Sequence, residues 1–173
     1  RNGKMNARAM VRTSVEMFHE GLISKERALL RIEPPMQEQL LVPQLSPEFH
    51  GKSLARGLAA SPGAASGKIV FDASSAEARG SAGEKVILVR KETSPEDIQG
   101  MNVAQGILTS TGGTTSHAAV VARGWGKCCI TGAGKLHIDE RRKTITIQGR
   151  RITGKDMISI DGTSGEVMLG DIP

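Results

Sequence analysis

Aromatic residues are scarce in this chain of 173 residues: they make up 2 %, with three Phe, one Trp and no Tyr. Base stacking needs aromatic side chains, so this scarcity argues against a nucleic-acid-binding protein although the net charge is +5. The basic residues are also scattered along the chain. We therefore expect no nucleic-acid partner and interpret the charge as a basic surface suited to a phosphate-rich ligand.

Cysteine is also rare, and its two copies, Cys128 and Cys129, are adjacent. Neighbouring cysteines rarely bridge each other, and neither a C-x-x-C spacing nor a histidine cluster suggests a metal site. We interpret both as small buried residues of an intracellular protein. No apolar run approaches the roughly 18 residues of a membrane span, and no signal peptide is visible, so we expect no membrane association.

Glycine is abundant, with 21 residues, and it separates short apolar runs. Residues 54–170 are therefore predicted to form a compact β-rich α/β domain with few helices. A helix start is indicated at Ser94 by an N-cap, a following proline and two acidic residues. The predicted strands are Gly67–Phe71, Lys85–Arg90, Gly106–Thr109, Cys128–Thr131, Thr144–Gln148, Met157–Ile160 and Gly165–Leu169.

The N-terminal part of the sequence has helix-forming patterns in place of short strand-like runs. Residues 4–20 predict an amphipathic helix that Gly21 ends, and Ser24 caps a second, shorter helix. We interpret residues 1–32 as the helical tail of a preceding domain, because the chain starts without Met and is expected to be a fragment. Residues 33–53 contain four prolines and predict a semi-rigid linker, and residues 171–173 are expected to begin a second linker.

The stretch GGTTSH, residues 112–117, carries the chemistry. Gly112 and Gly113 let the backbone turn and approach a ligand closely, and the hydroxyl of Thr115 or Ser116 can cap the helix that follows. We interpret Gly112, Gly113, Thr115 and Ser116 as a loop along which a phosphate group approaches. The following residue then lies beside the free N–H groups of a helix N-terminus, which form a site for anions.

His117 stands in that first helical turn. The positive end of the helix favours a neutral imidazole, so the position suits a histidine that acts as a nucleophile toward a phosphoryl group. The alternative is a surface or core histidine without chemistry. A Ser-His hydrolase is disfavoured, because adjacent side chains diverge on a helix and no G-x-S-x-G turn is present.

The residues after His117 are small and apolar. Ala118, Ala119 and Ala122 are expected to let the helix pack closely on a sheet. Val120 and Val121 are expected to supply its core contacts, and Gly124 is expected to end it.

The stretch GGTTSHAAVVARGWGKCC, residues 112–129, closely resembles the phosphohistidine signature of the pyruvate phosphate dikinase family, among the phosphoenolpyruvate-utilising enzymes. Further segments resemble the same family's swivelling domain, and the N-terminal segments resemble the end of its nucleotide-binding domain. One departure is Thr114, where relatives usually carry Met. The segments that carry the resemblance are GGTTSHAAVVARGWGKCC, LAASPGAASGKIVF, ILVRKETSPEDIQGM, DGTSGEVMLG, RNGK and EGLISKERALLRIEP.

The resemblance implies a swivelling β/β/α phosphohistidine domain in which His117 is phosphorylated. ATP and phosphate would give a pyrophosphoryl-histidine, then phosphohistidine, AMP and diphosphate, and phosphohistidine would convert pyruvate reversibly to phosphoenolpyruvate. The nucleotide-binding and pyruvate-binding domains, the Mg²⁺ and the homodimer contacts would lie outside this chain, so this piece alone is expected to complete no turnover. Thr115 matches the threonine that a regulatory kinase modifies in plant enzymes.

Two alternatives stay open at this point. The chain could be the phosphocarrier domain of a water dikinase or of phosphotransferase-system enzyme I, although both typically have Arg at the position of Thr114. It could also be a non-catalytic swivelling module, which an unreactive His117 would favour.

Overall fold

A computed structural model of the protein describes residues 7–31 and 53–172 and divides the chain into two compact units, residues 1–43 and 44–173. The predicted linker, apart from Ser53, lies outside the described residues. The domain boundaries proposed from the sequence therefore stay predictions. Near the C-terminus, Ile172 is buried, and its backbone N–H donates to the Ser159 hydroxyl at 2.9 Å.

The N-terminal unit contains the two expected helices, α1 (Ala7–His19) and α2 (Lys25–Leu30). Gly21 follows α1 with φ of +73°, a left-handed conformation that glycine adopts without strain. Ser24 is the N-cap of α2, and its hydroxyl accepts a hydrogen bond from the Arg27 N–H at 3.3 Å. The sequence signals for both helices are therefore confirmed over the described residues.

The larger unit is built on an eight-stranded sheet in the order β1-β11-β10-β3-β4-β5-β6-β2. The four central strands, β3 to β6, run parallel, and the outer pairs are antiparallel. The strands are β1 (Ser53–Arg56), β2 (Leu58–Ser61), β3 (Ala64–Val70), β4 (Val86–Arg90), β5 (Gly106–Thr109), β6 (Cys128–Thr131), β10 (Met157–Asp161) and β11 (Glu166–Leu169).

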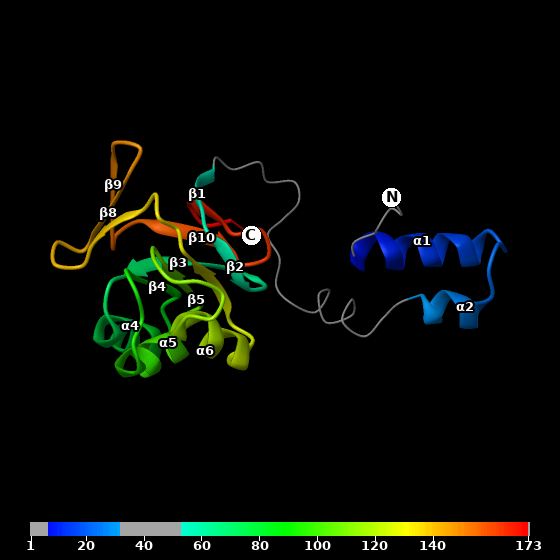
Figure 1. Ribbon diagram of the computed structural model, residues 1–173, viewed down its shortest axis with the longest axis horizontal. Coiled ribbons are helices and arrows are strands. Elements are labelled where there is room, and N and C mark those ends of the chain that lie inside the picture. The colour runs from blue at the N-terminus through cyan, green and yellow to red at the C-terminus, as the bar shows by residue number, and fades with distance from the viewer. Residues whose placement is uncertain (1–6, 32–52, 173) are drawn as a thin grey trace. The chain divides into compact units, whose positions relative to one another are not determined.

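A second sheet and a layer of helices lie on opposite sides of the large sheet (Figure 1). The second sheet has the order β7-β8-β9, with β7 (His137–Asp139), β8 (Thr144–Ile147) and β9 (Arg150–Thr153). The helices are α4 (Ala73–Ser81), α5 (Ile98–Val103), which a 3-10 turn (Pro95–Asp97) precedes, and α6 (His117–Trp125). The result is the β/β/α architecture that the resemblance implied.

Each face of the large sheet has its own apolar core. Ile87 and Val89 of β4 face the cluster that includes Ile145 and Ile152 of the small sheet, whereas Val86 and Leu88 face the helices. Strand side chains alternate between the two faces, so a strand covered on both sides must be apolar throughout. Burial on both faces explains the uninterrupted apolar run VILV, residues 86–89, within the predicted strand Lys85–Arg90.

All seven predicted strands are present, but β1, β2, β7, β9 and α4 were not predicted. Strands β1 and β2 are separated by Gly57, where the chain passes from one edge of the large sheet to the other. A Cβ at this position would lie 2.6 Å from both Ile130 Cγ2 and the Thr131 carbonyl oxygen, so the crossing depends on glycine. Helix α4 has the sequence ASSAEARGS, whose many small polar residues are typical of a loop.

Candidate functional site

Helix α6 begins where the sequence predicted it. Ser116 is its N-cap residue, with φ of −64° and ψ of 161°, and His117 is its first helical residue. The predicted end was wrong, because the helix passes through Gly124 and stops at Gly126, whose φ is +65°. A left-handed residue ends the helix, and Gly126 is the residue that takes this conformation.

The packing of α6 follows from its small residues. Ala118, Ala119 and Ala122 are buried, so the helix lies close to the sheet as expected. Val121 packs at the margin of this core, but the expectation for Val120 was wrong, because its side chain is 53 % exposed. It stands three residues after the half-buried His117, on the same helix face, and that face is directed away from the sheet.

The loop before α6 brings the predicted glycines next to the helix start. Gly112 has φ of +91°, and a Cβ there would lie 3.0 Å from the Ser116 Cβ. The Gly113 carbonyl accepts hydrogen bonds from the Ser116 N–H at 3.1 Å and from the Thr131 hydroxyl at 3.3 Å. Thr115 is exposed, so its hydroxyl is accessible beside the helix start.

The cap of α6 differs from the expectation in one respect. Ser116 has the backbone of an N-cap, but its side chain makes no capping hydrogen bond. Its Oγ is buried and has no hydrogen-bond partner within the part of the chain that the structure describes. The free N–H groups of the first turn therefore remain available to an anion.

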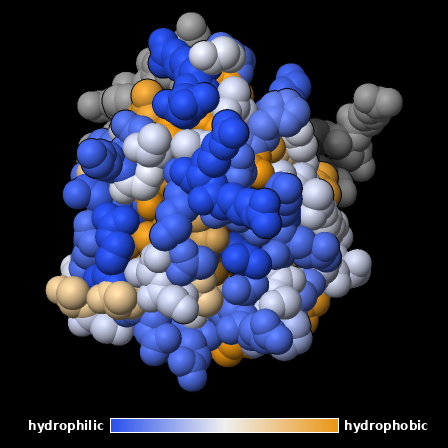
Figure 2. All heavy atoms as spheres, turned by 90° about the vertical axis from the view of Figure 1, so that its left-hand side faces the viewer, coloured by the Kyte–Doolittle hydropathy of each residue, from blue (hydrophilic) through white to orange (hydrophobic). Residues whose placement is uncertain are grey.

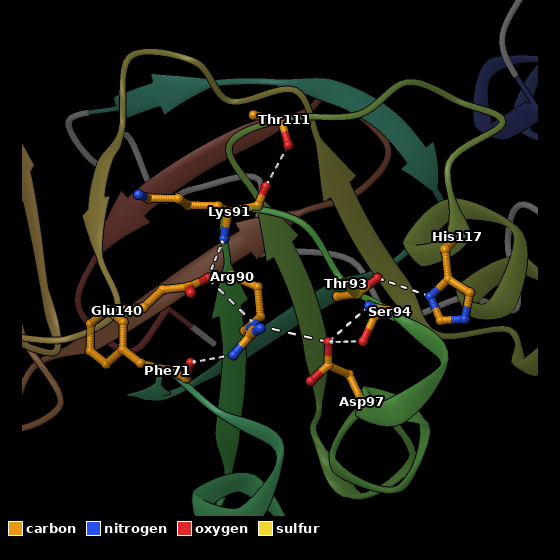
Figure 3. Close-up of polar contacts among 9 residues, drawn as sticks. All are labelled: Phe71, Arg90, Lys91, Thr93, Ser94, Asp97, Thr111, His117 and Glu140. Carbon is orange, nitrogen blue, oxygen red and sulfur yellow. Dashed lines mark hydrogen bonds and ion pairs between the residues drawn. The ribbon is translucent and has the colours of Figure 1, made fainter.

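His117 is held through one ring nitrogen. Its Nδ1 lies 3.1 Å from the hydroxyl oxygen of Thr93, which is 5 % exposed, and its Nε2 points away from Thr93 (Figure 3). A threonine hydroxyl can accept from a protonated Nδ1 or donate to an unprotonated one, so both tautomers of the ring fit this contact. A neutral ring with the proton on Nδ1 donates to Thr93 and keeps a free electron pair on Nε2.

The segment that carries Thr93 is itself fixed by hydrogen bonds. The Ser94 N–H donates to Asp97 Oδ2 at 2.8 Å, within a capping box at the N-cap residue that the sequence had indicated, Ser94. The Lys91 N–H donates to Glu140 Oε1 at 3.0 Å, and the Lys91 carbonyl accepts from the Thr111 hydroxyl at 2.7 Å (Figure 3). The sequence analysis missed Thr93 and Glu140, since only the fold brings Thr93 to His117 and Glu140 to the segment that carries Thr93.

Neither the two cysteines nor the cleft beside α4 forms part of the site at His117. Burial raises the pKa of Cys128 and of Cys129 to about 12, which leaves the thiols protonated and unreactive near neutral pH. A cleft of about 610 Å³ lies by α4 and the small sheet, on the mainly hydrophilic side shown in Figure 2, and His117 is not among its lining residues.

Within residues 7–31 and 53–172, no group of three or more His, Cys, Asp or Glu residues is arranged to hold a metal ion. None of the helices in these ranges combines the length and the apolar character that a membrane crossing requires.

Comparisons with known proteins found relatives that are similar to the whole chain. Residues 82–165 match the family described as PEP-utilising enzyme, mobile domain. The whole chain is 50 % identical to "Pyruvate, phosphate dikinase" of Rhizobium meliloti (strain 1021), over 19 % of that protein. It is 49 % identical to "Pyruvate, phosphate dikinase 2" of Oryza sativa subsp. japonica, again over the whole chain, and covers 20 % of that protein.

A third relative, "Pyruvate, phosphate dikinase" of Clostridium symbiosum, is 49 % identical over 99 % of this chain and 20 % of its own length. A solved structure titled "N-terminal domain of Enzyme 1 - Nitrogen" matches 49 % of this chain and 31 % of its own, with 22 % identity and a TM-score of 0.37. The chain thus spans about a fifth of the curated relatives it matches. It belongs to the PEP-utilising enzymes and contains their mobile domain.

Proposed function

We propose that this chain is the phosphohistidine carrier portion of a pyruvate, phosphate dikinase and that His117 carries the phosphoryl group. The observation that supports this most directly is the position of His117. Its Nδ1 is held by Thr93, its Nε2 is free, and it opens a helix whose N–H groups no side chain caps within the described residues. Such a histidine combines a nucleophile with an anion-binding position.

The phosphoryl step would run through Nε2. Its electron pair forms the N–P bond while the bond from phosphorus to the leaving oxygen breaks, and the leaving group takes that electron pair. The proton stays on Nδ1, donated to Thr93 Oγ1, so the positive charge that develops on the ring has a hydrogen-bond acceptor. Transfer to an acceptor oxygen reverses these changes and restores the neutral ring.

The relatives' names support the full reaction that the sequence implied. ATP and phosphate would yield AMP, diphosphate and phosphohistidine, and pyruvate would accept the phosphoryl group to give phosphoenolpyruvate. These names favour the dikinase over the water dikinase and enzyme I alternatives. Because this chain spans about a fifth of its relatives, the nucleotide and pyruvate sites and the dimer contacts belong to the rest of the polypeptide in this proposal.

The described residues do not offer a site for Mg²⁺, since none of their carboxylate, cysteine and histidine groups is arranged for a metal. We therefore derive no step through a metal held by this chain, and we assign Mg²⁺ to the nucleotide-binding part. For location, we propose the interior of a cell, in the cytoplasm or in an organelle.

Thr115 is the proposed regulatory position. It is exposed, lies two residues before His117, and stands on the loop along which the incoming phosphates would approach. A phosphate on its hydroxyl would place about two negative charges beside this path and repel the substrate.

The test uses the full-length protein treated with phosphoenolpyruvate or with ATP and phosphate. Intact-mass analysis under alkaline conditions should show one acid-labile phosphoryl group, which His117→Asn abolishes. The matched control is His137→Asn, at an exposed position on β7, which should be labelled normally. Normal labelling of His117→Asn would refute the proposal.

A further inference from the structure

We propose that two carboxylates outside the phosphohistidine signature of residues 112–129, Asp97 and Glu140, are positioning residues for His117. They act through the segment from Arg90 to Ser94, which carries Thr93, and thereby fix which imidazole nitrogen is free. This inference rests on the proposed phosphohistidine function. It adds the residues that make Nε2 the nucleophile and gives the small sheet a role in the chemistry.

The first step of the argument is that Thr93 lies between two fixed points. On its N-terminal side, the Lys91 N–H donates to Glu140 Oε1 at 3.0 Å, and the Lys91 carbonyl accepts from Thr111. On its C-terminal side, the Ser94 N–H donates to Asp97 Oδ2 at 2.8 Å. With the backbone fixed on both sides, the hydroxyl of Thr93 has little freedom to leave His117.

The second step is that one cation joins the two carboxylates. The Nε of Arg90 lies 3.5 Å from Glu140 Oε1 and 3.9 Å from Asp97 Oδ2, and its Nη1 donates to the Phe71 carbonyl at 3.5 Å (Figure 3). The side chain of Asp97 is 7 % exposed and that of Arg90 is 25 % exposed. Charges held this far from water stay in place only when they are paired, so losing one carboxylate disturbs the whole group.

The third step concerns where the carboxylates come from. Asp97 ends the 3-10 turn after β4, whereas Glu140 directly follows β7 of the small sheet. The small sheet packs on the face of the large sheet opposite the helices (Figure 1), so Glu140 links this layer to the edge where Thr93 and His117 meet. The small sheet therefore contributes to catalytic geometry as well as to the core.

The consequence is a fixed ring orientation in which Nδ1 meets Thr93. A hydroxyl can donate or accept, and the proposal gives Thr93 the acceptor role, so that Nδ1 carries the proton and Nε2 is presented. If either carboxylate is lost, the Thr93 segment can shift, and the ring can adopt the other tautomer, in which Nε2 carries the proton and cannot attack.

The experiment compares Glu140→Ala and Asp97→Asn with Glu92→Ala and Glu96→Gln. Both control positions are exposed acidic residues of the same segment. The first measurement is the tautomer of His117 in each ¹⁵N-labelled chain, from long-range ¹H–¹⁵N correlation spectra above neutral pH. The wild type and the controls should show the proton on Nδ1, and the two variants should show a mixture of tautomers.

The second measurement is the rate at which phosphoramidate, a small donor, phosphorylates His117, followed by mass spectrometry. We expect a decrease of roughly tenfold in the two variants, as for a displaced catalytic group, and less than twofold in the controls. Amide correlation spectra check that each chain is folded. If Asp97→Asn does not fold, Glu140→Ala decides, because the Glu140 side chain is 32 % exposed.

The outcomes separate this inference from the proposed function. Wild-type tautomers and rates in the folded variants would overturn the inference while leaving phospho-His117 intact. A wild-type ring with its proton on Nε2 would also overturn it. Absence of His117 labelling in the full-length protein would instead refute the function, and the tautomer measurement, which needs no phosphoryl donor, would still test the positioning role.

Discussion

The two loops that meet at His117 are held in different ways. The loop of residues 110–116 supplies the histidine, has exposed threonines at 114 and 115, and is anchored mainly through backbone groups. The loop of residues 91–97 supplies Thr93 and is fixed by two carboxylates and an arginine. In the proposed function, the first loop receives the phosphate ligand, whereas the second provides the rigid reference that orients His117.

This difference predicts that removing a fixed side chain of the second loop lowers stability as well as transfer, whereas changing an exposed side chain of the first loop affects mainly phosphoryl transfer. A phosphate must enter and leave the first loop, so many fixed side-chain contacts there would obstruct it. The second loop meets no ligand in the proposed function and can be packed tightly. The following predictions test this division.

The largest effect is expected for Asp97→Ala. It leaves the Ser94 N–H without its acceptor and removes one of the two carboxylates around Arg90, which should lower the free energy of unfolding by about 2–4 kcal/mol. Urea denaturation of the purified chain at constant pH measures this value. The exposed neighbour provides the control, because Glu96→Ala should change the value by less than about 0.5 kcal/mol. Equal values for both variants would contradict the division.

In the first loop, Thr115→Asp should reduce phosphorylation from ATP by roughly tenfold or more, because a carboxylate beside His117 repels the incoming polyphosphate. Its exposed position predicts an unfolding free energy within about 0.5 kcal/mol of wild type. Thr115→Ser keeps the hydroxyl and should retain activity. The full-length protein is assayed by intact mass and by thermal unfolding. Full labelling of Thr115→Asp would show that this loop does not line the approach.

Gly112→Ala tests the one position in the first loop where backbone conformation matters. Its φ of +91° is strained for an L side chain, and the added Cβ would lie 3.0 Å from Ser116, so we expect a loss of about 1–2 kcal/mol. Gly113→Ala is the matched control, because no atom lies within 4 Å of its Cβ position. Urea denaturation measures the free energy of unfolding of both variants. Equal values would show that position 112 does not require glycine.

The smallest effect is expected at a surface pair outside both loops. Hydrogen bonds from Arg79 lower the pKa of Glu84 from 4.5 to about 2. A depressed carboxyl pKa stabilises the fold above the unfolded value and loses that contribution as the pH falls through about 2. NMR titration of Glu84 should show this low pKa, and Arg79→Gln should return it toward 4.5. An unchanged pKa in Arg79→Gln would contradict this assignment, and high salt should weaken the effect.

Local signals explain which parts of the site the sequence predicted. His117 and the N-cap position of Ser116 follow from hydroxyl residues placed before a run of small helical residues, and the buried alanines follow from their size. The end of the helix was predicted two residues early, because Gly124 and Gly126 look alike in sequence. Only the backbone conformation distinguishes them, and only Gly126 has a positive φ.

By itself, the sequence determined the candidate histidine, the apolar strands of the central sheet and the helix starts at Ser24, Ser94 and Ser116. These depend on residues within a few positions of one another. The tertiary structure alone decided which imidazole nitrogen is free, because Thr93 lies 24 residues before His117 and Glu140 lies 49 residues after Lys91. Such contacts form only when parallel strands and the small sheet bring their ends to one edge, and no local pattern encodes that meeting.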